Sequence, residues 1–250
     1  MTLPPLRRQV LVGCDQSTAY RLFLAEIGSW WPLATHGCFG TGGSLVFDGE
    51  RIVETGPDGD VAVWGTVVAR DEPHAITFTW HPGRTAEAAT QVTVTFTPTG
   101  DPASTLVTLQ HSGWEIHADP DAARGEYAGG WVTVLERYAD GRPASGAGEV
   151  DLWLILEHRP GPAAPAAGVF SSPDFGRHLE FLGTLHEQGL LVAGGPLPDS
   201  PGAGMTIVRA ASADAARRVV RAAQVEDGSV AAGLLDVRIR PWRVAMTGDD

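Results

Sequence analysis

The chain has 250 residues, which is enough for one large domain or two of ordinary size. Its 18 basic and 30 acidic residues give a formal net charge of −12, and a phosphate backbone or an anionic membrane surface would repel that charge. We therefore expect no nucleic acid and no membrane among its partners. Every basic residue is an arginine, so mechanisms that need a Schiff-base or P-loop lysine are excluded.

The N-terminal sequence lacks a charged segment followed by an apolar one, and the chain contains no long apolar run, so we expect a cytoplasmic protein. Hydrophobic residues make up 43% of the chain, enough to fill a core. Cys14 and Cys38 are the only cysteines, too few for a disulfide framework or a cysteine zinc site.

The first part of the chain begins with a strand and a helix and continues as a run of strands. Asp15 is a plausible cap for a helix that ends near Phe23. Alternating side chains predict strands at 8–12, 44–47, 51–54, 61–68, 75–80, 91–97 and 105–111, and helical spacing predicts a closing helix from about Ala122 to Tyr138. A curved antiparallel sheet closed by one long helix tends to enclose a cavity.

Residues 141–148 have the glycine, proline and small side chains of a linker. We therefore predict a first domain (1–142), a linker (143–149) and a second domain (150–250). In the second domain we expect strands at 151–157, 190–193, 205–208 and 234–242, and helices at 174–189 and 212–223, with Gly194–Pro196 as a turn that ends a strand. The order β-α-β-β-α-β is ferredoxin-like, so the whole chain is predicted to be α+β.

Six segments of the first domain carry a recognisable pattern: Ile27–Pro32, Asp48–Glu54, Val63–Val67, Phe78–Gly83, His111–Glu115 and Tyr127–Trp131. They resemble the branch of the START/SRPBCC superfamily named after the heat-shock-protein-90 ATPase activator, over roughly residues 8–140. The resemblance implies a helix-grip fold with an internal pocket. It does not imply a chaperone role.

The second domain contains the segments Arg177–Leu182, Leu190–Pro196, Asp227–Leu234 and Val237–Trp242. They resemble the YCII-related family, over roughly residues 150–245, which implies a ferredoxin-like fold that usually forms homodimers through its sheets. A few members act on chlorinated aromatic compounds. The family's paired histidine and aspartate fall on His178 and Asp227. The family commonly has proline after the aspartate, so Gly228 leads us to expect a looser loop and a less firmly aimed Asp227.

His178 and Asp227 are therefore the candidate catalytic residues. An imidazole can take and return a proton near neutral pH, and a carboxylate on its other nitrogen would fix its tautomer. Helical spacing predicts that His178 points toward the sheet, on one face with Phe175, Leu179, Leu182, Leu185 and His186. The alternative is a core histidine satisfied by a hydrogen bond.

Six of the eight tryptophans lie in the first domain, and each brings a large apolar surface and one N–H donor. The candidate residues for contact with a flat or apolar ligand are Trp31, Trp64, Trp80, His81, Trp114 and Trp131. The alternative for each tryptophan is that it fills the core. The acidic cluster Asp48–Glu54 is expected on a solvated hairpin.

The sequence contains no Gly-x-Ser-x-Gly elbow, no His-x-x-x-His pair on a helix and no dinucleotide fingerprint, so we expect no nucleophile, no metal and no cofactor. We predict a cytoplasmic protein whose first domain binds a small apolar or aromatic molecule. The second domain would form a homodimer and could catalyse proton transfer, elimination or isomerisation, as a lyase or isomerase does. The alternative is a non-catalytic ligand sensor or carrier with the second domain as a dimerisation module.

Overall fold

The computed structural model describes residues 3–140 and 151–247, which form two compact units of mixed α and β structure. The linker predicted at 143–149 lies outside the described residues. None of the helices in the described ranges is both long and apolar enough to cross a membrane.

The first unit is a seven-stranded sheet with four helices. Its elements are β1 (Leu6–Val12), α1 (Gln16–Ala25), α2 (Ile27–Trp30), α3 (Leu33–His36), β2 (Ser44–Asp48), β3 (Arg51–Thr55), β4 (Val61–Asp71), β5 (Ala75–Trp80), β6 (Thr90–Pro98), β7 (Thr105–Ser112) and α4 (Pro120–Asp140). The strands are antiparallel and follow the order β1-β7-β6-β5-β4-β3-β2 across the sheet.

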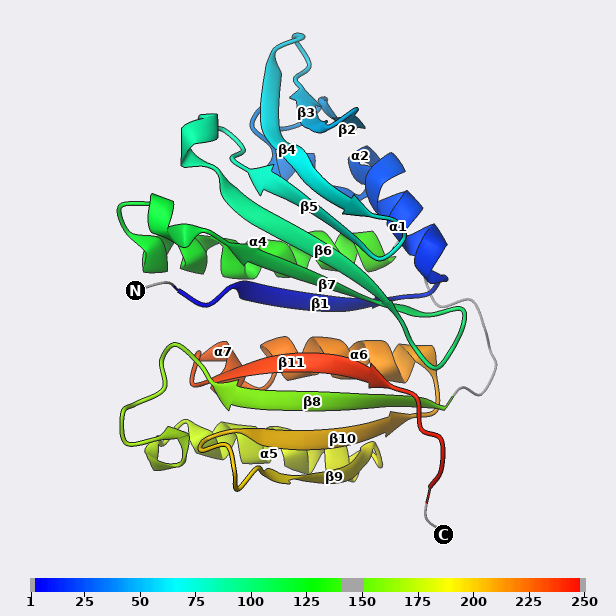
Figure 1. The fold of residues 1–250 in the computed structure, drawn as a ribbon, viewed down its shortest axis with the longest axis vertical. Helices are drawn as coiled ribbons and strands as arrows, with labels where there is room; N and C mark the ends of the chain where they lie inside the picture. The colour runs from blue at the N-terminus through cyan, green and yellow to red at the C-terminus, as the bar shows by residue number, and fades with distance from the viewer. Residues whose placement is uncertain (1–2, 141–150, 248–250) are drawn as a thin grey trace. The chain divides into compact units, whose positions relative to one another are not determined.

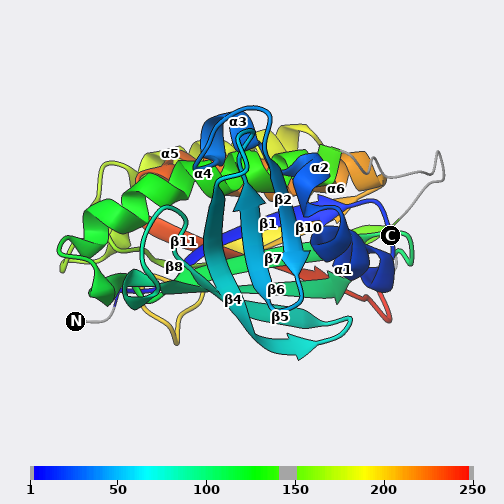
Figure 2. The same ribbon diagram turned by 90° about the horizontal axis from the view of Figure 1, so that it is seen from above.

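The long helix α4 lies along one face of this curved sheet (Figures 1 and 2). It buries Trp131, Val134, Leu135 and Tyr138 on one side, at the spacing of successive helical turns. Register shifts at Ile52/Val53 and Val67/Ala69 interrupt the pairing of β3 with β4 and of β4 with β5, and bulges of this kind increase the bend of a sheet. The predicted α+β fold with a large antiparallel sheet and a closing helix is confirmed.

The local signals behind the first helix act as expected. Asp15 is the N-cap of α1, where its carboxylate accepts a hydrogen bond from the Thr18 backbone N–H. The two short helices α2 and α3 were not predicted, because each spans only four residues and a single turn carries no periodicity.

The second unit is a four-stranded antiparallel sheet with its elements in the order β-α-β-β-α-β. They are β8 (Leu152–Pro160), α5 (Phe175–Glu187), β9 (Leu191–Pro196), β10 (Gly204–Ala210), α6 (Ala213–Val225), a short α7 (Gly228–Ala231) and β11 (Leu235–Trp242). The strand order is β11-β8-β10-β9, and α5 and α6 lie over the same face of the sheet (Figure 1). Ser212 caps α6 by accepting a hydrogen bond from Ala215 N–H.

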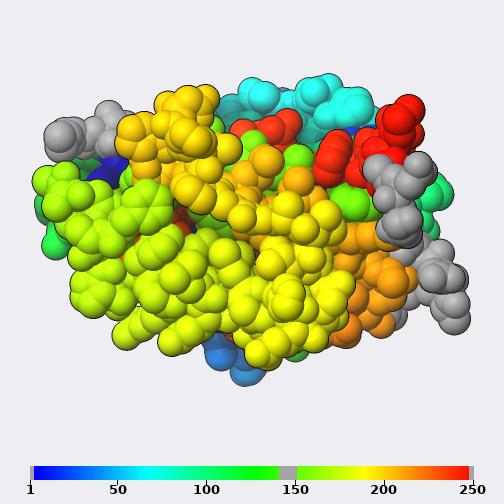
Figure 3. Space-filling model, turned by 90° about the horizontal axis from the view of Figure 1, so that it is seen from below, coloured from blue at the N-terminus to red at the C-terminus, as the bar shows by residue number. Residues whose placement is uncertain are grey.

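Three details of the second unit differ from the sequence prediction. Gly194–Pro196 is not a turn but forms the last three residues of β9, with Gly195 opposite Met205, and Pro196 is tolerated because β9 is an edge strand. Leu179 and His186 are exposed and do not belong to the buried face of α5. Figure 3 shows a face of the molecule on which the yellow-green to yellow residues around α5 lie at the surface.

Candidate functional site

The first unit contains a cavity of about 550 Å³ between α4, the end of β5 and the segment that follows α2. Its aromatic and polar lining side chains are Trp31, His36, Cys38, Trp80, Arg84, Glu126, Tyr127 and Trp131. Volumes of 300–1,000 Å³ are typical of small-molecule sites (roughly the size that covers a drug-like ligand). A molecule of one to three fused rings is therefore the scale that this cavity accommodates.

Three indole rings form one wall of the cavity. The ring centroids of Trp31 and Trp80 lie 5.5 Å apart, those of Trp80 and Trp131 lie 5.3 Å apart, and those of Trp31 and Trp131 lie 5.8 Å apart. The rings meet at angles of 45° to 86°, the tilted and edge-to-face contacts that aromatic quadrupoles favour. This wall is preformed, because each ring is already held by the other two.

A chain of hydrogen bonds fixes Trp131 from behind. Its Nε1–H donates to His111 Nδ1 at 3.0 Å, so the neutral His111 ring carries its proton on Nε2 and donates to Thr90 Oγ1 at 2.6 Å. The Thr90 hydroxyl in turn donates to the Trp80 carbonyl oxygen at 2.9 Å. Burial, with a smaller effect of His117, lowers the pKa of His111 to about 3. A neutral His111 therefore connects two residues of the aromatic wall.

Three of the predicted ligand contacts do not line the cavity. Trp64 and Trp114 have no exposed surface, because Trp64 packs behind Trp31 and Trp80, and Trp114 packs on the His111 ring with a centroid distance of 4.0 Å. His81 is buried as well and pairs through Nδ1 with the Arg84 carbonyl oxygen at 3.1 Å. For these three residues the core alternative describes the structure better than ligand contact.

The sequence analysis had placed Glu54 on a solvated hairpin. In the structure Glu54 is instead fully buried behind the cavity. Its carboxylate accepts hydrogen bonds from the Cys38 N–H at 2.7 Å, the Phe39 N–H at 3.1 Å and Trp64 Nε1–H at 2.9 Å. Partial burial and the Glu54 carboxylate raise the pKa of the Cys38 thiol to about 11. Cys38 is therefore a protonated thiol at neutral pH and a weak nucleophile.

In the second unit, the structure brings His178 and Asp227 together. His178 lies on the buried face of α5 with Phe181 and Leu185, and its Nδ1 is 2.6 Å from Asp227 Oδ2. Because an ionised carboxylate only accepts, the proton of this hydrogen bond comes from His178 Nδ1. The neutral ring then has Nε2 free to accept a proton.

Asp227 is held more firmly than expected from the glycine that follows it. It is the N-cap of α7, and its Oδ1 accepts from the Ser229 N–H at 2.9 Å and the Val230 N–H at 3.4 Å. Gly228 packs closely under Arg177, where a Cβ atom would lie 2.6 Å from the Arg177 side chain. The absence of proline here thus leaves Asp227 in place.

His158 on β8 is a third buried member of this cluster, and the sequence analysis did not select it. Its ring centroid is 4.5 Å from that of His178, and its Nε2 is 4.0 Å from Asp227 Oδ2. Neither ring nitrogen of His158 has a hydrogen-bond partner. Burial, reinforced by His178 and opposed by Asp227, lowers the pKa of His158 to about 4.

The histidines open on a small pocket of about 90 Å³. Its other side chains are mainly apolar and include Phe170, Phe175, Leu179, Leu182 and Met205. A space of about 10–15 Å³ on this scale is enough for one water molecule, so the pocket has room for several waters. Phe170 and Leu179 are the exposed large apolar side chains of its lining.

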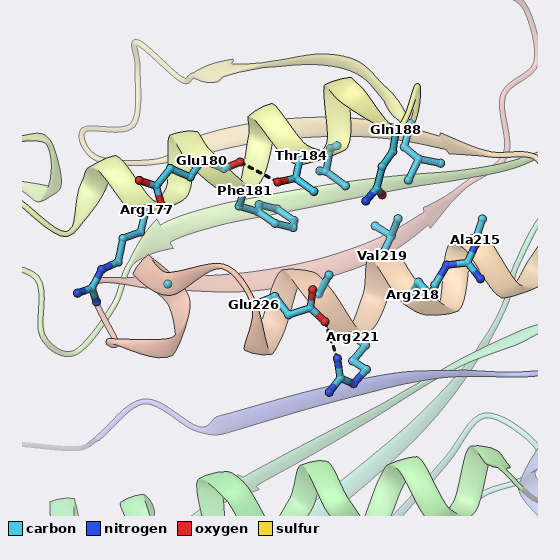
Figure 4. A pocket seen from close by; sticks show the side chains of 14 residues that line it. Arg177, Glu180, Phe181, Thr184, Gln188, Ala215, Arg218, Val219, Arg221 and Glu226 are labelled. Carbon is cyan, nitrogen blue, oxygen red and sulfur yellow. Dashed lines mark hydrogen bonds and ion pairs between the residues drawn. The ribbon is translucent and has the colours of Figure 1, made fainter.

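A larger groove of about 870 Å³ runs between α5 and α6 (Figure 4). Phe181 and Val219 line it, Arg177 and Arg218 stand on opposite sides, and Arg221 forms an ion pair with Glu226. The charged side chains are exposed, and the lining described here includes no histidine or cysteine. Its carboxylates are those of Glu180 and Glu226, and Glu226 is the partner of Arg221 in that ion pair.

Strand alternation carried a signal for the two buried residues that sequence analysis missed. His158 has the same parity as Leu152, Leu154 and Leu156, which point into the core of the second unit. Glu54 likewise has the same parity as Ile52, which is fully buried. Polar residues on an otherwise apolar face of a strand are thus the candidates for buried functional residues.

Comparison with known proteins concerns the first unit. Residues 19–140 match the family model described as activator of Hsp90 ATPase homolog 1-like protein. No curated protein is similar enough to the chain to count as a match. The YCII-related resemblance lies outside the matched residues and stays a prediction.

Solved structures similar to this chain include a protein of Mesorhizobium loti (20% identity, 53% of this chain and 95% of that chain, TM-score 0.38) and an HSP90 activator of Plasmodium falciparum (17% identity, 56% and 98%, TM-score 0.41). Another is described as an anthrahydroquino-γ-pyrone synthase (25% identity, 56% and 97%, TM-score 0.39). With the family match and the curved sheet closed by α4, the first unit has the START-like fold of activator of Hsp90 ATPase homolog 1-like proteins.

Proposed function

We propose that the first unit binds a small, flat, apolar or aromatic molecule in the cavity beside α4. The observation that carries this proposal is the wall formed by Trp31, Trp80 and Trp131 around a space of about 550 Å³. Burying one aromatic ring on such a wall removes on the order of 100 Å² of apolar surface from water, worth about 2–3 kcal/mol. Contact of more than one ring with this wall is therefore needed to offset the cost of association.

The polar side chains at the mouth of the cavity restrict which chemical groups the ligand has at its solvent-facing end. Arg84 and Glu126 are exposed at the rim, and His36 and the Cys38 thiol lie beside them. This mixture suits a hydroxyl or carbonyl group, which accepts from a guanidinium or donates to a carboxylate, better than a purely hydrocarbon chain. A hydroxylated or carbonyl-bearing ring compound is the ligand class that fits both ends.

Two adjacent glycines of α4 provide a matched test. Gly130 lines the cavity, whereas Gly129 is exposed and an added Cβ atom would meet nothing within 4 Å. Gly130→Leu fills the cavity, and Gly129→Leu makes the same change on the outside of the same helix. With 1-anilinonaphthalene-8-sulfonate as the probe, we expect at least a tenfold loss of affinity in Gly130→Leu and none in Gly129→Leu. Equal affinity in the two variants would refute the cavity as the binding site.

We further infer that the second unit is a YCII-related, ferredoxin-like domain in which His178 acts as a general base oriented by Asp227. The element order, the strand order β11-β8-β10-β9 and the hydrogen bond of 2.6 Å support this inference. His178 Nε2 would remove a proton from a carbon next to a carbonyl or activated ring. The proton returns at another carbon in an isomerisation, or a leaving group departs with its electron pair in an elimination.

Variants of two histidines on α5 test this role. On a panel of activated carbonyl and halogenated ring compounds, His178→Ala should lose about 10²- to 10⁴-fold in rate, the usual contribution of a general base. His186→Ala is the control, because His186 is exposed on the same helix. Turnover that survives in His178→Ala would contradict the catalytic role. It would leave the alternative of a sensor or carrier, which the small volume beside His178 also favours.

A further inference from the structure

His158, His178 and Asp227 come from β8, α5 and the start of α7, and one potential ligand atom of each lies within 4.8 Å of the others. All three side chains are buried, with exposed fractions of 2%, 7% and 0%. We propose that these three residues bind a divalent first-row transition metal ion, such as Zn²⁺. This site does not depend on the ligand cavity of the first unit or on the proton-transfer role of His178.

The strongest reason is the unsatisfied state of His158. Both of its ring nitrogens are buried without a hydrogen-bond partner. A buried polar group without a partner costs about 1–3 kcal/mol, so such groups call for an explanation. A neutral imidazole nitrogen is a good ligand for zinc, and a bound ion would give His158 Nε2 the partner that the protein does not provide.

The distances between the groups are close to those of a tetrahedral site. Zinc bonds of about 2.0–2.1 Å place two ligand atoms about 3.3 Å apart. Asp227 Oδ2 lies 2.6 Å from His178 Nδ1 and 4.0 Å from His158 Nε2. Each distance therefore changes by about 0.7 Å when the ion enters, which is within the reach of side-chain rotations. Two histidines and one carboxylate are also a known ligand set for iron(II).

The rest of the carboxylate is already arranged as a metal site requires. Asp227 Oδ1 is occupied by the Ser229 and Val230 N–H groups, so only Oδ2 faces the histidines. Such outer hydrogen bonds orient a ligating carboxylate and strengthen the site. The position of Oδ2 is thereby fixed before the ion arrives.

We place the open coordination position on the side of the adjoining pocket, which the two histidines line and Asp227 does not. His158 and His178 line the pocket of about 90 Å³, which accommodates water molecules without any side-chain movement. A tetrahedral ion with three protein ligands keeps its fourth position for water, the arrangement of catalytic zinc sites and not of structural ones. The pocket thus has room for the water that such an ion would carry.

Metal binding and the hydrogen bond between His178 and Asp227 exclude each other. To coordinate through Nδ1, the neutral His178 ring must carry its proton on Nε2, and the Nδ1–H donor to Asp227 is lost. The metal-bound form therefore lacks the free Nε2 acceptor that proton abstraction needs. Zinc should suppress any proton-transfer activity of this site, whereas ligand binding in the first unit is unaffected.

Metal content of the full chain tests the proposal directly. After treatment with a chelator, the protein is dialysed against ZnCl₂ at micromolar concentration, and bound zinc is measured by mass spectrometry of the element. Addition of Co²⁺ gives a second readout, because tetrahedral cobalt with nitrogen and oxygen ligands has visible absorption bands. We expect one ion per chain and a visible cobalt spectrum.

Three variants complete the test. His158→Phe keeps a flat buried ring but removes the ligand, and it should weaken zinc binding about 100-fold. Asp227→Asn keeps a good N-cap residue and should weaken binding as well. His186→Gln changes an exposed histidine of α5 and should leave binding unchanged. Zinc binding that is absent from the wild type, or equal in His158→Phe, or lost in His186→Gln, would overturn the proposal, and circular dichroism confirms that each variant is folded.

Discussion

His111 provides a stability prediction that follows from its two hydrogen bonds. Because its Nδ1 accepts from Trp131 and its buried Nε2–H donates to Thr90, protonation of the ring breaks the bond to Trp131. The pKa of His111 is lowered to about 3, whereas an unfolded chain titrates this group near 6.5. His111→Gln is the perturbation, since a glutamine amide has one acceptor and donors but does not titrate in this range.

The sign of the effect follows from the direction of the shift. Between pH 6.5 and about 3 the unfolded chain binds a proton at His111 and the folded protein does not. The stability that the neutral His111 contributes is therefore complete above pH 6.5 and falls as the pH is lowered, by about 1.4 kcal/mol per pH unit. From pH 6.5 to 4.5 this contribution amounts to about 3 kcal/mol, a large part of the stability of an ordinary domain.

Urea unfolding followed by tryptophan fluorescence measures this contribution, because six of the eight tryptophans belong to the first unit. The free energy of unfolding is determined at pH 7.5, 6.5, 5.5 and 4.5 for the wild type and for His111→Gln. We expect the variant to be less stable at pH 7.5 but to lose about 3 kcal/mol less than the wild type between pH 6.5 and 4.5. Parallel pH profiles would refute the assignment of a neutral His111.

Two further predictions concern the stability of the first unit. Glu54→Ala should lower the free energy of unfolding by more than about 3 kcal/mol, because it leaves the N–H groups of Cys38, Phe39 and Trp64 without an acceptor. Glu54→Gln keeps one oxygen and should lower it less. Thermal unfolding of the two variants measures the difference. Gly65→Ala should prevent stable folding, since the added Cβ atom would lie 1.8 Å from the Thr79 carbonyl oxygen. Gly129→Ala, on the exposed side of α4, should instead stabilise the protein by up to about 1 kcal/mol. Similar melting temperatures of the two variants would contradict this reasoning.

Periodicity predicted the elements of this protein well, because apolar residues recur at the spacing of the faces that become buried. Trp131 was placed on the inner face of α4, and the ring of His178 was placed toward the sheet. Leu179 was assigned to the buried face of α5 and is instead exposed, because the buried stripe of α5 runs through Phe181 and Leu185 at spacings of three and four. Helical spacing alone was compatible with a buried face through Leu179 and His186 and with one through Phe181 and Leu185.

The composition of the sites was harder to predict than the fold. Strand alternation shows which residues share a face, but it does not show which distant segment covers that face. Glu54 is buried because the backbone of residues 38 and 39 lies against its carboxylate, a contact over more than ten residues of sequence. For the same reason, sequence could not distinguish Trp31, which lines the cavity, from Trp64, which packs behind it.

Burial by itself does not tell which histidines are available for function, and the hydrogen-bond partners do. His111 and His158 are both almost completely buried, and burial lowers the pKa of both. Both ring nitrogens of His111 are bonded to protein groups, so this residue has no capacity left for a ligand. His158 has no partner on either nitrogen and lies beside His178 and the shared oxygen of Asp227. Since a fold gains nothing from a buried imidazole that bonds to nothing, His158 is the histidine whose position is best explained by something that binds to it.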